Sequence, residues 1–181
     1  MTFPELMSAI RASYAEVLSP AVLACEPAWR EAAMRGAAGA LKLDGTPPLP
    51  HRFDVLEADG DSRMVDAQRQ LKFEPFEFEL SGMSVSVAPF TWDWLTLAVE
   101  GDAARATQVA AEWFLHWFDA EDEQTPGDDG LRGVVHYMGD PKPVDGGVEL
   151  RIDFGSAPDE VVDDLLFALA EAGMTRASMR A

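Results

Sequence analysis

Cysteine is almost absent from this sequence: the 181 residues include one, Cys25. An internal disulfide is therefore excluded, and a reducing cytoplasm is the location we expect. Long apolar runs are missing too, since no stretch approaches the roughly 18 residues that a membrane span requires. The first ten residues, MTFPELMSAI, have neither the basic start nor the apolar centre of a secretory leader, so we expect none.

The short motifs of common enzyme classes are also missing. The sequence contains no G-x-S-x-G, no phosphate-binding loop and no G-x-G-x-x-G, so it indicates neither an activated serine nor a nucleotide site. Its three histidines lack a zinc-binding spacing, and one cysteine cannot build a zinc cluster. We therefore expect no cofactor, and the sequence favours a protein without catalytic activity.

Basic residues are few. The chain has 14 Lys and Arg against 32 Asp and Glu, which gives a formal net charge of −18. Residues 73–181 carry most of it, because their 6 basic and 22 acidic side chains sum to −16. Such a surface repels phosphate, so we expect no binding to nucleic acid or to anionic membranes. It suits a basic protein partner, and it suits simple solubility equally well.

The C-terminal half of the chain contains two similar strand–helix–strand units. The strand segments alternate apolar and polar residues, and the helical segments repeat apolar residues at three- and four-residue steps. The predicted elements, in order, are Trp94–Val99, Asp102–Phe118, Arg132–Met138, Val148–Phe154, Pro158–Ala172 and Met174–Met179. This βαββαβ order is typical of a ferredoxin-like layer, an antiparallel sheet with two helices on one face. We predict an α+β fold of this kind.

The rest of the chain is divided by composition. We predict an N-terminal helical segment (1–43), a loop-rich connector (44–75) and an α+β sheet domain (76–181), packed together as one compact domain. Residues 2–5 (TFPE) form a capping box for a first helix, which we expect Pro20 to end, and a second helix is expected from Pro27.

Two further local features are predicted before the βαββαβ region. Residues 59–61 (DGD) mark a turn inside the connector. Residues 76–80 and 83–87 alternate apolar and polar side chains around Ser81-Gly82, and this pattern predicts a hairpin that extends the sheet.

His136 is the residue that best suits catalysis or ligand binding. It alternates with Val134 and Met138 on a predicted strand, and its pKa is ordinarily near neutrality. With Asp153 or Glu149 as a partner, it forms a weak candidate acid–base pair. A hydrogen-bonded core histidine is the competing interpretation, and it is the more common one.

The densest group of carboxylates follows the first long helix of the sheet domain. Glu121, Asp122, Asp128 and Asp129 are weak candidates for a metal site there. Calcium loops alternate their acidic ligands and place a glutamate at the twelfth position, and this segment does neither. A solvated acidic loop explains the residues better.

Phe167 lies on the polar side of the last predicted helix. Its neighbours on that side are Glu160, Asp163, Asp164 and Glu171. An apolar anchor with an acidic rim is typical of a protein-binding surface, although single exposed apolar residues are also common.

Three functions follow from these observations. The leading hypothesis is a small, acidic, cytoplasmic protein-binding module, such as a bacterial inhibitor or immunity-type protein that covers a basic partner. The first alternative is a small-ligand-binding protein or enzyme that uses the sheet face around His136. The second is a structural homodimer without catalytic activity.

Overall fold

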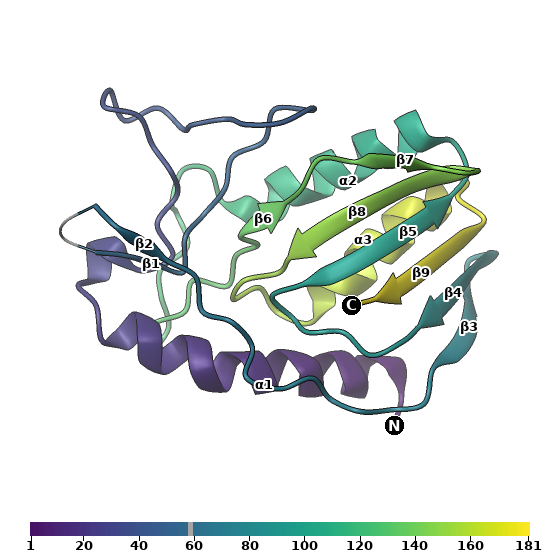
Figure 1. Ribbon diagram of the computed structural model, residues 1–181, viewed down its shortest axis with the longest axis horizontal. Helices are drawn as coiled ribbons and strands as arrows, with labels where there is room; N and C mark the ends of the chain where they lie inside the picture. The colour runs from purple at the N-terminus through teal and green to yellow at the C-terminus, as the bar shows by residue number, and fades with distance from the viewer. Residues whose placement is uncertain (58–59) are drawn as a thin grey trace.

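The computed structural model describes residues 1–57 and 60–181 and shows a mixed α+β protein (Figure 1). Within these ranges the chain forms three α-helices, one short 3-10 turn, a seven-stranded sheet and a separate two-stranded ribbon. The expected combination of helices with a mostly antiparallel sheet is therefore confirmed. The turn expected at residues 59–61 begins at Asp59, which lies outside the described residues.

The first helix, α1 (Phe3–Leu23), begins at the predicted capping box. The Thr2 hydroxyl accepts a hydrogen bond from the amide of Glu5, whose carboxylate accepts one from the amide of Thr2. The predicted end at Pro20 is wrong, because the helix continues through that residue. Val22 is fully buried beyond the proline, so packing against the core offsets the missing amide donor.

The second predicted helix is wrong after its first turn. Pro27–Trp29 form a 3-10 turn (η1), and the next residues pair with distant backbone. Arg30 forms an antiparallel bridge with Val55, and Ala33 forms one with Arg52. These long-range bridges use backbone amides and carbonyls that a helix would need for its own hydrogen bonds. Tertiary pairing therefore overrides the local helix propensity.

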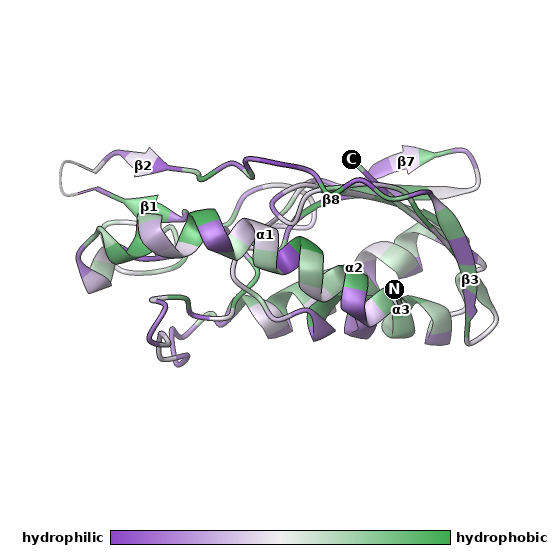
Figure 2. Ribbon diagram, turned by 90° about the horizontal axis from the view of Figure 1, so that it is seen from below, coloured by the Kyte–Doolittle hydropathy of each residue, from purple (hydrophilic) through white to green (hydrophobic). Residues whose placement is uncertain are grey.

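Helices α2 (Ala103–Phe118) and α3 (Glu160–Glu171) lie within the two predicted helical segments, which confirms both. Asp102 caps α2, since its carboxylate accepts hydrogen bonds from the backbone amides of Ala104 and Arg105 in the first turn. The two helices lie side by side on one face of the sheet (Figures 1 and 2). Their apolar stripes and the facing side of the sheet form the core.

The sheet follows the order β3-β4-β9-β5-β8-β6, with β7 also paired to β8. Its strands are β3 (Phe76–Leu80), β4 (Met83–Val87), β5 (Leu95–Glu100), β6 (Tyr137–Met138), β7 (Lys142–Val144), β8 (Gly147–Asp153) and β9 (Arg176–Arg180). β4 and β9 run parallel, and the other neighbouring strands run antiparallel. The predicted hairpin is confirmed as β3–β4, and it extends the sheet beyond β9.

The strand predicted over Arg132–Met138 is wrong for most of its length, because β6 occupies only its last two residues. Upstream, backbone amides bond to other parts of the fold. The amide of Val135 donates to the carbonyl of Trp117, and the amide of Arg132 donates to the Glu31 carboxylate. This irregular segment delivers His136 into the interior. The sequence pattern does not predict β7, since all of its residues are exposed.

The connector contains a short antiparallel ribbon, β1 (Val55–Leu56) and β2 (Ser62–Arg63). In Figure 1 this ribbon lies beyond the end of the sheet, next to the C-terminal part of α1. Among the helices of residues 1–57 and 60–181, none combines the length and apolar character of a membrane span.

Candidate functional site

Four charged side chains are buried together where the connector meets the sheet. Glu31, Asp54 and His136 have no exposed surface, and Asp153 is 3% exposed. Glu31 follows η1, Asp54 precedes β1, His136 precedes β6, and Asp153 ends β8. Segments far apart in the sequence therefore meet in one polar group, which we call the His136 cluster: Glu31, Asp54, His136 and Asp153.

The His136 ring lies between two carboxylates. Its Nε2 atom makes a 2.7 Å hydrogen bond with Oε1 of Glu31. Its Nδ1 atom lies 2.7 Å from Oδ1 of Asp54. Neither of these atoms is in an aligned hydrogen bond, so this second contact is an ion pair in which the ring N–H does not point at the carboxylate oxygen. Gly155 packs against the ring with a φ of 54°, and a Cβ atom there would lie 2.1 Å from Cδ2 of His136.

Glu31 is held in place by backbone as well as by the imidazole. Its φ of 47° lies in the left-handed region, which glycine usually occupies. The second oxygen of its carboxylate accepts a 2.6 Å hydrogen bond from the amide of Arg132. Its carbonyl accepts a 2.8 Å hydrogen bond from the guanidinium of Arg52. These contacts fix Glu31 in an otherwise unfavourable conformation.

Arg52 is a further buried charge in this region, at 1% exposure. Its guanidinium donates to the carbonyls of Phe118 and Asp119 at the end of α2, and it pairs with Asp122 at 2.8 Å. Partial burial of Asp122 works against ionisation, but the hydrogen bond and charge of Arg52 outweigh it and lower the pKa of that carboxyl. Arg52 thus joins the connector to the end of α2.

The pKa values in the His136 cluster are shifted strongly. Burial lowers the pKa of His136, but the carboxylates of Asp54 and Glu31 outweigh it and raise this pKa to about 10. Burial raises the pKa of Asp153 to about 7, with the charge of Asp54 adding to the rise and that of His136 opposing it. Both side chains therefore bind protons more tightly in the folded protein than in the unfolded chain.

Further polar atoms around the cluster lack partners. The Tyr14 hydroxyl and Oδ1 of Asp93 are buried and make no hydrogen bond within the described residues. Burial raises the pKa of Tyr14, and the charges of Asp153, Asp54, Asp93 and Glu31 raise it further. Tyr14, from α1, therefore lies beside the same carboxylates.

A cavity of about 240 Å³ opens next to the cluster. Aspartates, two aromatic rings and a short connector segment form its wall, namely Asp54, Met64, Val65, Asp66, Asp93, Trp94, Tyr137 and Asp153. The connector segment is tied to the wall, since the amide of Val65 bonds to Asp54 and the amide of Ala67 bonds to Asp93. No Lys or Arg is among these lining residues.

Of the predicted acid–base group, the structure brings His136 and Asp153 together but not Glu149. The amide of His136 donates to the Asp153 carbonyl at 3.1 Å, and their side chains share the cluster. Glu149 does not belong to it, because its carboxylate accepts a 2.6 Å hydrogen bond from Arg180 on β9. Sequence reasoning missed Glu31 and Asp54, since each lies in an irregular segment without a periodic pattern.

The predicted acidic loop has a different arrangement. Asp122 pairs with Arg35 and Arg52, and Oδ1 of Asp129 accepts a hydrogen bond from a nearby backbone amide. Glu121 and Asp128 are exposed. Within the described residues, the group with metal-ligand spacing is Asp54, His136 and Asp153, and none of these loop carboxylates belongs to it.

Phe167 is 46% exposed on α3. Of its predicted acidic neighbours, Glu160, Asp164 and Glu171 are exposed and Asp163 is half-buried. Burial raises the pKa of Asp163, and the neighbouring acidic charges of α3 raise it further.

Comparison with known protein families, characterised proteins and solved structures finds no match to this chain. Any functional conclusion therefore depends on the geometry of the structure itself.

Proposed function

We propose that this protein binds a small, positively charged ligand in the cavity beside the His136 cluster. The observation that carries the proposal is an excess of negative charge: Asp54, Asp93 and Asp153 line the cavity, Glu31 lies behind it, and His136 is the one cationic group inside the cluster. Buried carboxylates are stable when a cation compensates them. A cationic ligand would supply that compensation.

The surrounding aromatic rings support the same ligand class. Trp94 and Tyr137 are 43% and 38% exposed at the cavity. Aromatic faces attract cations, and the guanidinium of Arg151 already lies 4.9 Å from the centre of the Trp94 ring. The cavity therefore combines carboxylates with rings that favour positive charge.

Binding suits the site better than acid–base catalysis by His136. A general acid or base must reach the reacting atom directly or through one water. The imidazole of His136 is fully buried between Glu31 and Asp54, and Gly155 packs on its ring. The imidazole therefore orients the carboxylates that face the cavity.

A panel of ligands tests this proposal. Small organic ammonium ions, divalent metal ions and neutral or anionic analogues are added separately, and the thermal midpoint of unfolding is measured. A ligand that binds the folded state raises the midpoint. We expect cations to raise it and the analogues to leave it unchanged, and Asp93→Asn to reduce the rise. If no cation in the panel raises the midpoint, the proposal fails.

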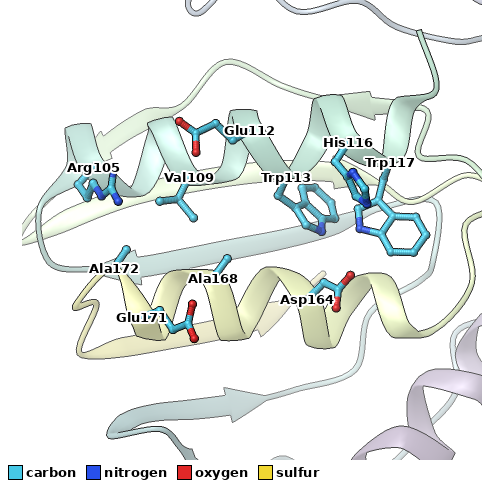
Figure 3. A pocket seen from close by; sticks show the side chains of 10 residues that line it. All are labelled: Arg105, Val109, Glu112, Trp113, His116, Trp117, Asp164, Ala168, Glu171 and Ala172. Carbon is cyan, nitrogen blue, oxygen red and sulfur yellow. The ribbon is translucent and has the colours of Figure 1, made fainter. Parts of the chain in front are cut away.

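A second candidate function is the binding of a basic protein segment, and the groove between α2 and α3 favours it. Trp113 and Trp117 form part of an apolar floor. The carboxylates of Glu112, Asp164 and Glu171 line the groove and outnumber its basic side chains, Arg105 and His116 (Figure 3). A basic amphipathic segment fits this combination of apolar and acidic surface. This candidate includes the inhibitor or immunity-type role and a cytoplasmic location.

Titration with a basic amphipathic peptide tests the second candidate. We expect tryptophan fluorescence to change on binding and the affinity to fall as salt is added. Trp117→Ala should abolish the change, whereas Phe167→Ala, another partly exposed aromatic on this helical layer, should not. If only the Phe167 variant loses binding, the peptide binds the acidic face of α3 and not the groove. Sedimentation of the native chain tests a homodimer.

We also infer a ferredoxin-like layer within the larger sheet. The order β9-β5-β8-β6 and the placement of α2 and α3 on one face support it. This architecture hosts many activities, so it favours no function over another.

A further inference from the structure

Three side chains of the His136 cluster bring metal-ligand atoms close together. A carboxylate oxygen of Asp54, a ring nitrogen of His136 and a carboxylate oxygen of Asp153 lie within 4.8 Å of one another. Two ligands that each lie about 2.1 Å from one ion are about 3.0–3.4 Å apart, for octahedral to tetrahedral angles. The 2.7 Å between Nδ1 of His136 and Oδ1 of Asp54 is a little shorter, so these two atoms would move slightly apart when an ion binds.

The orientation of the imidazole is fixed by a second carboxylate. Oε1 of Glu31 bonds Nε2 of His136, while Oε2 of Glu31 is held by the amide of Arg132. With Nε2 as the donor to Glu31, Nδ1 is unprotonated and its lone pair is free to bind an ion. Metal-binding histidines almost always have such a carboxylate or carbonyl on the other nitrogen. Glu31 is therefore a positioning residue for the imidazole of His136.

Unsatisfied polar atoms at the same point are an independent observation. Nδ1 of His136 and Oδ1 of Asp54 are fully buried, and neither makes an aligned hydrogen bond. The Tyr14 hydroxyl, 1% exposed and beside the same carboxylates, has no hydrogen-bond partner among the described residues. Buried polar atoms nearly always bond to protein, ordered water or an ion. An ion or water molecule bound within this cluster would give these atoms the partners they lack.

We propose that Asp54, His136 and Asp153 bind a divalent transition-metal ion, with Glu31 positioning the imidazole. The inference rests on the proposed function and names the class of cation. Two carboxylates and an imidazole bring net negative charge to one point, which a divalent ion balances. An imidazole ligand favours zinc or iron, and the carboxylates also suit manganese, whereas magnesium and calcium favour sites made wholly of oxygen.

The cavity leaves part of the ion's coordination open. Asp54 and Asp153 belong to both the cluster and the cavity wall, so the remaining coordination positions of the ion face the cavity. Three protein ligands with an open position are the arrangement that lets a metal ion hold water or a further donor group. The unbonded Oδ1 of Asp93, on the same wall, is placed to accept a hydrogen bond from that group.

Metal titration of the full chain tests the assignment. The protein is stripped with a chelator, titrated calorimetrically with zinc or manganese chloride, and its metal content is measured by mass spectrometry after dialysis. We expect one ion per chain and much weaker binding of magnesium. Glu31→Gln should weaken affinity by about 10–100-fold, as expected for a group that orients a ligand. Asp153→Asn should weaken it more.

Two matched variants keep the test decisive. Asp153→Asn preserves the side-chain shape and an acceptor for the amide of Gly155, so it should stay folded. Asp145→Asn makes the same change at an exposed position in the turn between β7 and β8, outside both the ligand set and the cavity wall, and should bind metal like the native chain. If Asp145→Asn weakens binding as much as Asp153→Asn, the ligand assignment is overturned.

The ligand panel separates the two proposals. If the folded chain binds organic ammonium ions but neither zinc nor manganese, the metal assignment is wrong and the cation-binding function stands. If it binds neither kind of cation, both are wrong.

Discussion

Replacing His136 by glutamine probes the central interaction of the buried cluster. In the metal-free protein the imidazole carries the positive charge between Glu31 and Asp54, at 2.7 Å from each. Its loss leaves those carboxylates close together, buried and unpaired. Breaking a buried ion pair by removing one partner costs about 3–5 kcal/mol, so we expect the free energy of unfolding to fall by that amount. The pKa rise from 6.5 to about 10 has the same order.

Urea unfolding followed by tryptophan fluorescence, with chelator present, measures this change as a shift in midpoint at constant slope. The double variant Glu31→Gln/His136→Gln serves as the control, because it removes one of the stranded charges. We expect it to be more stable than His136→Gln alone. A loss below about 1 kcal/mol in the single variant, the size of one ordinary hydrogen bond, would refute the reasoning.

The same cluster predicts how stability depends on pH in the metal-free protein. The folded-state pKa values of His136 and Asp153 are both raised, so the folded chain binds more protons than the unfolded chain. The contribution of His136 is fully present below pH 6.5 and is lost as the pH rises through about 10. Because the pKa of Asp153 is raised from 3.8 to about 7, its ionisation lowers the stability of the folded protein increasingly as the pH rises between these two values. Unfolding midpoints should therefore fall from pH 5 to pH 9, and His136→Gln should flatten the upper part of the curve.

Two further substitutions test the packing around the cluster. Arg52→Met should destabilise the protein by about 3–5 kcal/mol because it leaves three backbone carbonyls without their buried donor and removes one of the two ion pairs of Asp122. Arg69→Ala, which removes an exposed ion pair, should cost less than about 1 kcal/mol. Gly155→Ala should cost more than the roughly 1–2 kcal/mol of a left-handed residue, because its Cβ would overlap the His136 ring. Gly146 has a φ of 75°, and a Cβ atom added there would have no heavy atom within 4 Å. Gly146→Ala should therefore cost only the strain of the left-handed backbone. Urea unfolding checks all four, and equal losses for the two glycine variants would contradict the packing argument.

The parts of the fold that sequence predicted well are those built on local periodicity. The β3–β4 hairpin, α2, α3 and β8 each present a regular apolar stripe or alternation, and each stripe is buried in the structure except that of β3, which is half-buried. Local patterns record which face a residue presents, so these elements were accessible from sequence alone.

The candidate site was not accessible in this way. Glu31 lies in a predicted helix but adopts left-handed backbone, held there by the amide of Arg132 and the side chain of Arg52. Asp54 follows a proline-rich loop and meets His136 only through long-range packing. Such contacts join residues many positions apart, and no short-range spacing records them. The sequence points to His136 because it alternates with two apolar residues and its pKa is ordinarily near neutrality, whereas Glu31 and Asp54 carry no comparable signal.

The place of β9 in the sheet constrains how this chain folds as it leaves the ribosome. β9 lies between β4 and β5, although it follows every other strand in sequence. Until it is synthesised, the β3–β4 hairpin and the β5–β8 pair expose two unpaired edges that no other segment fills. Such edges invite pairing with other chains. Nascent or prematurely terminated chains of this protein should therefore depend on chaperones to stay monomeric.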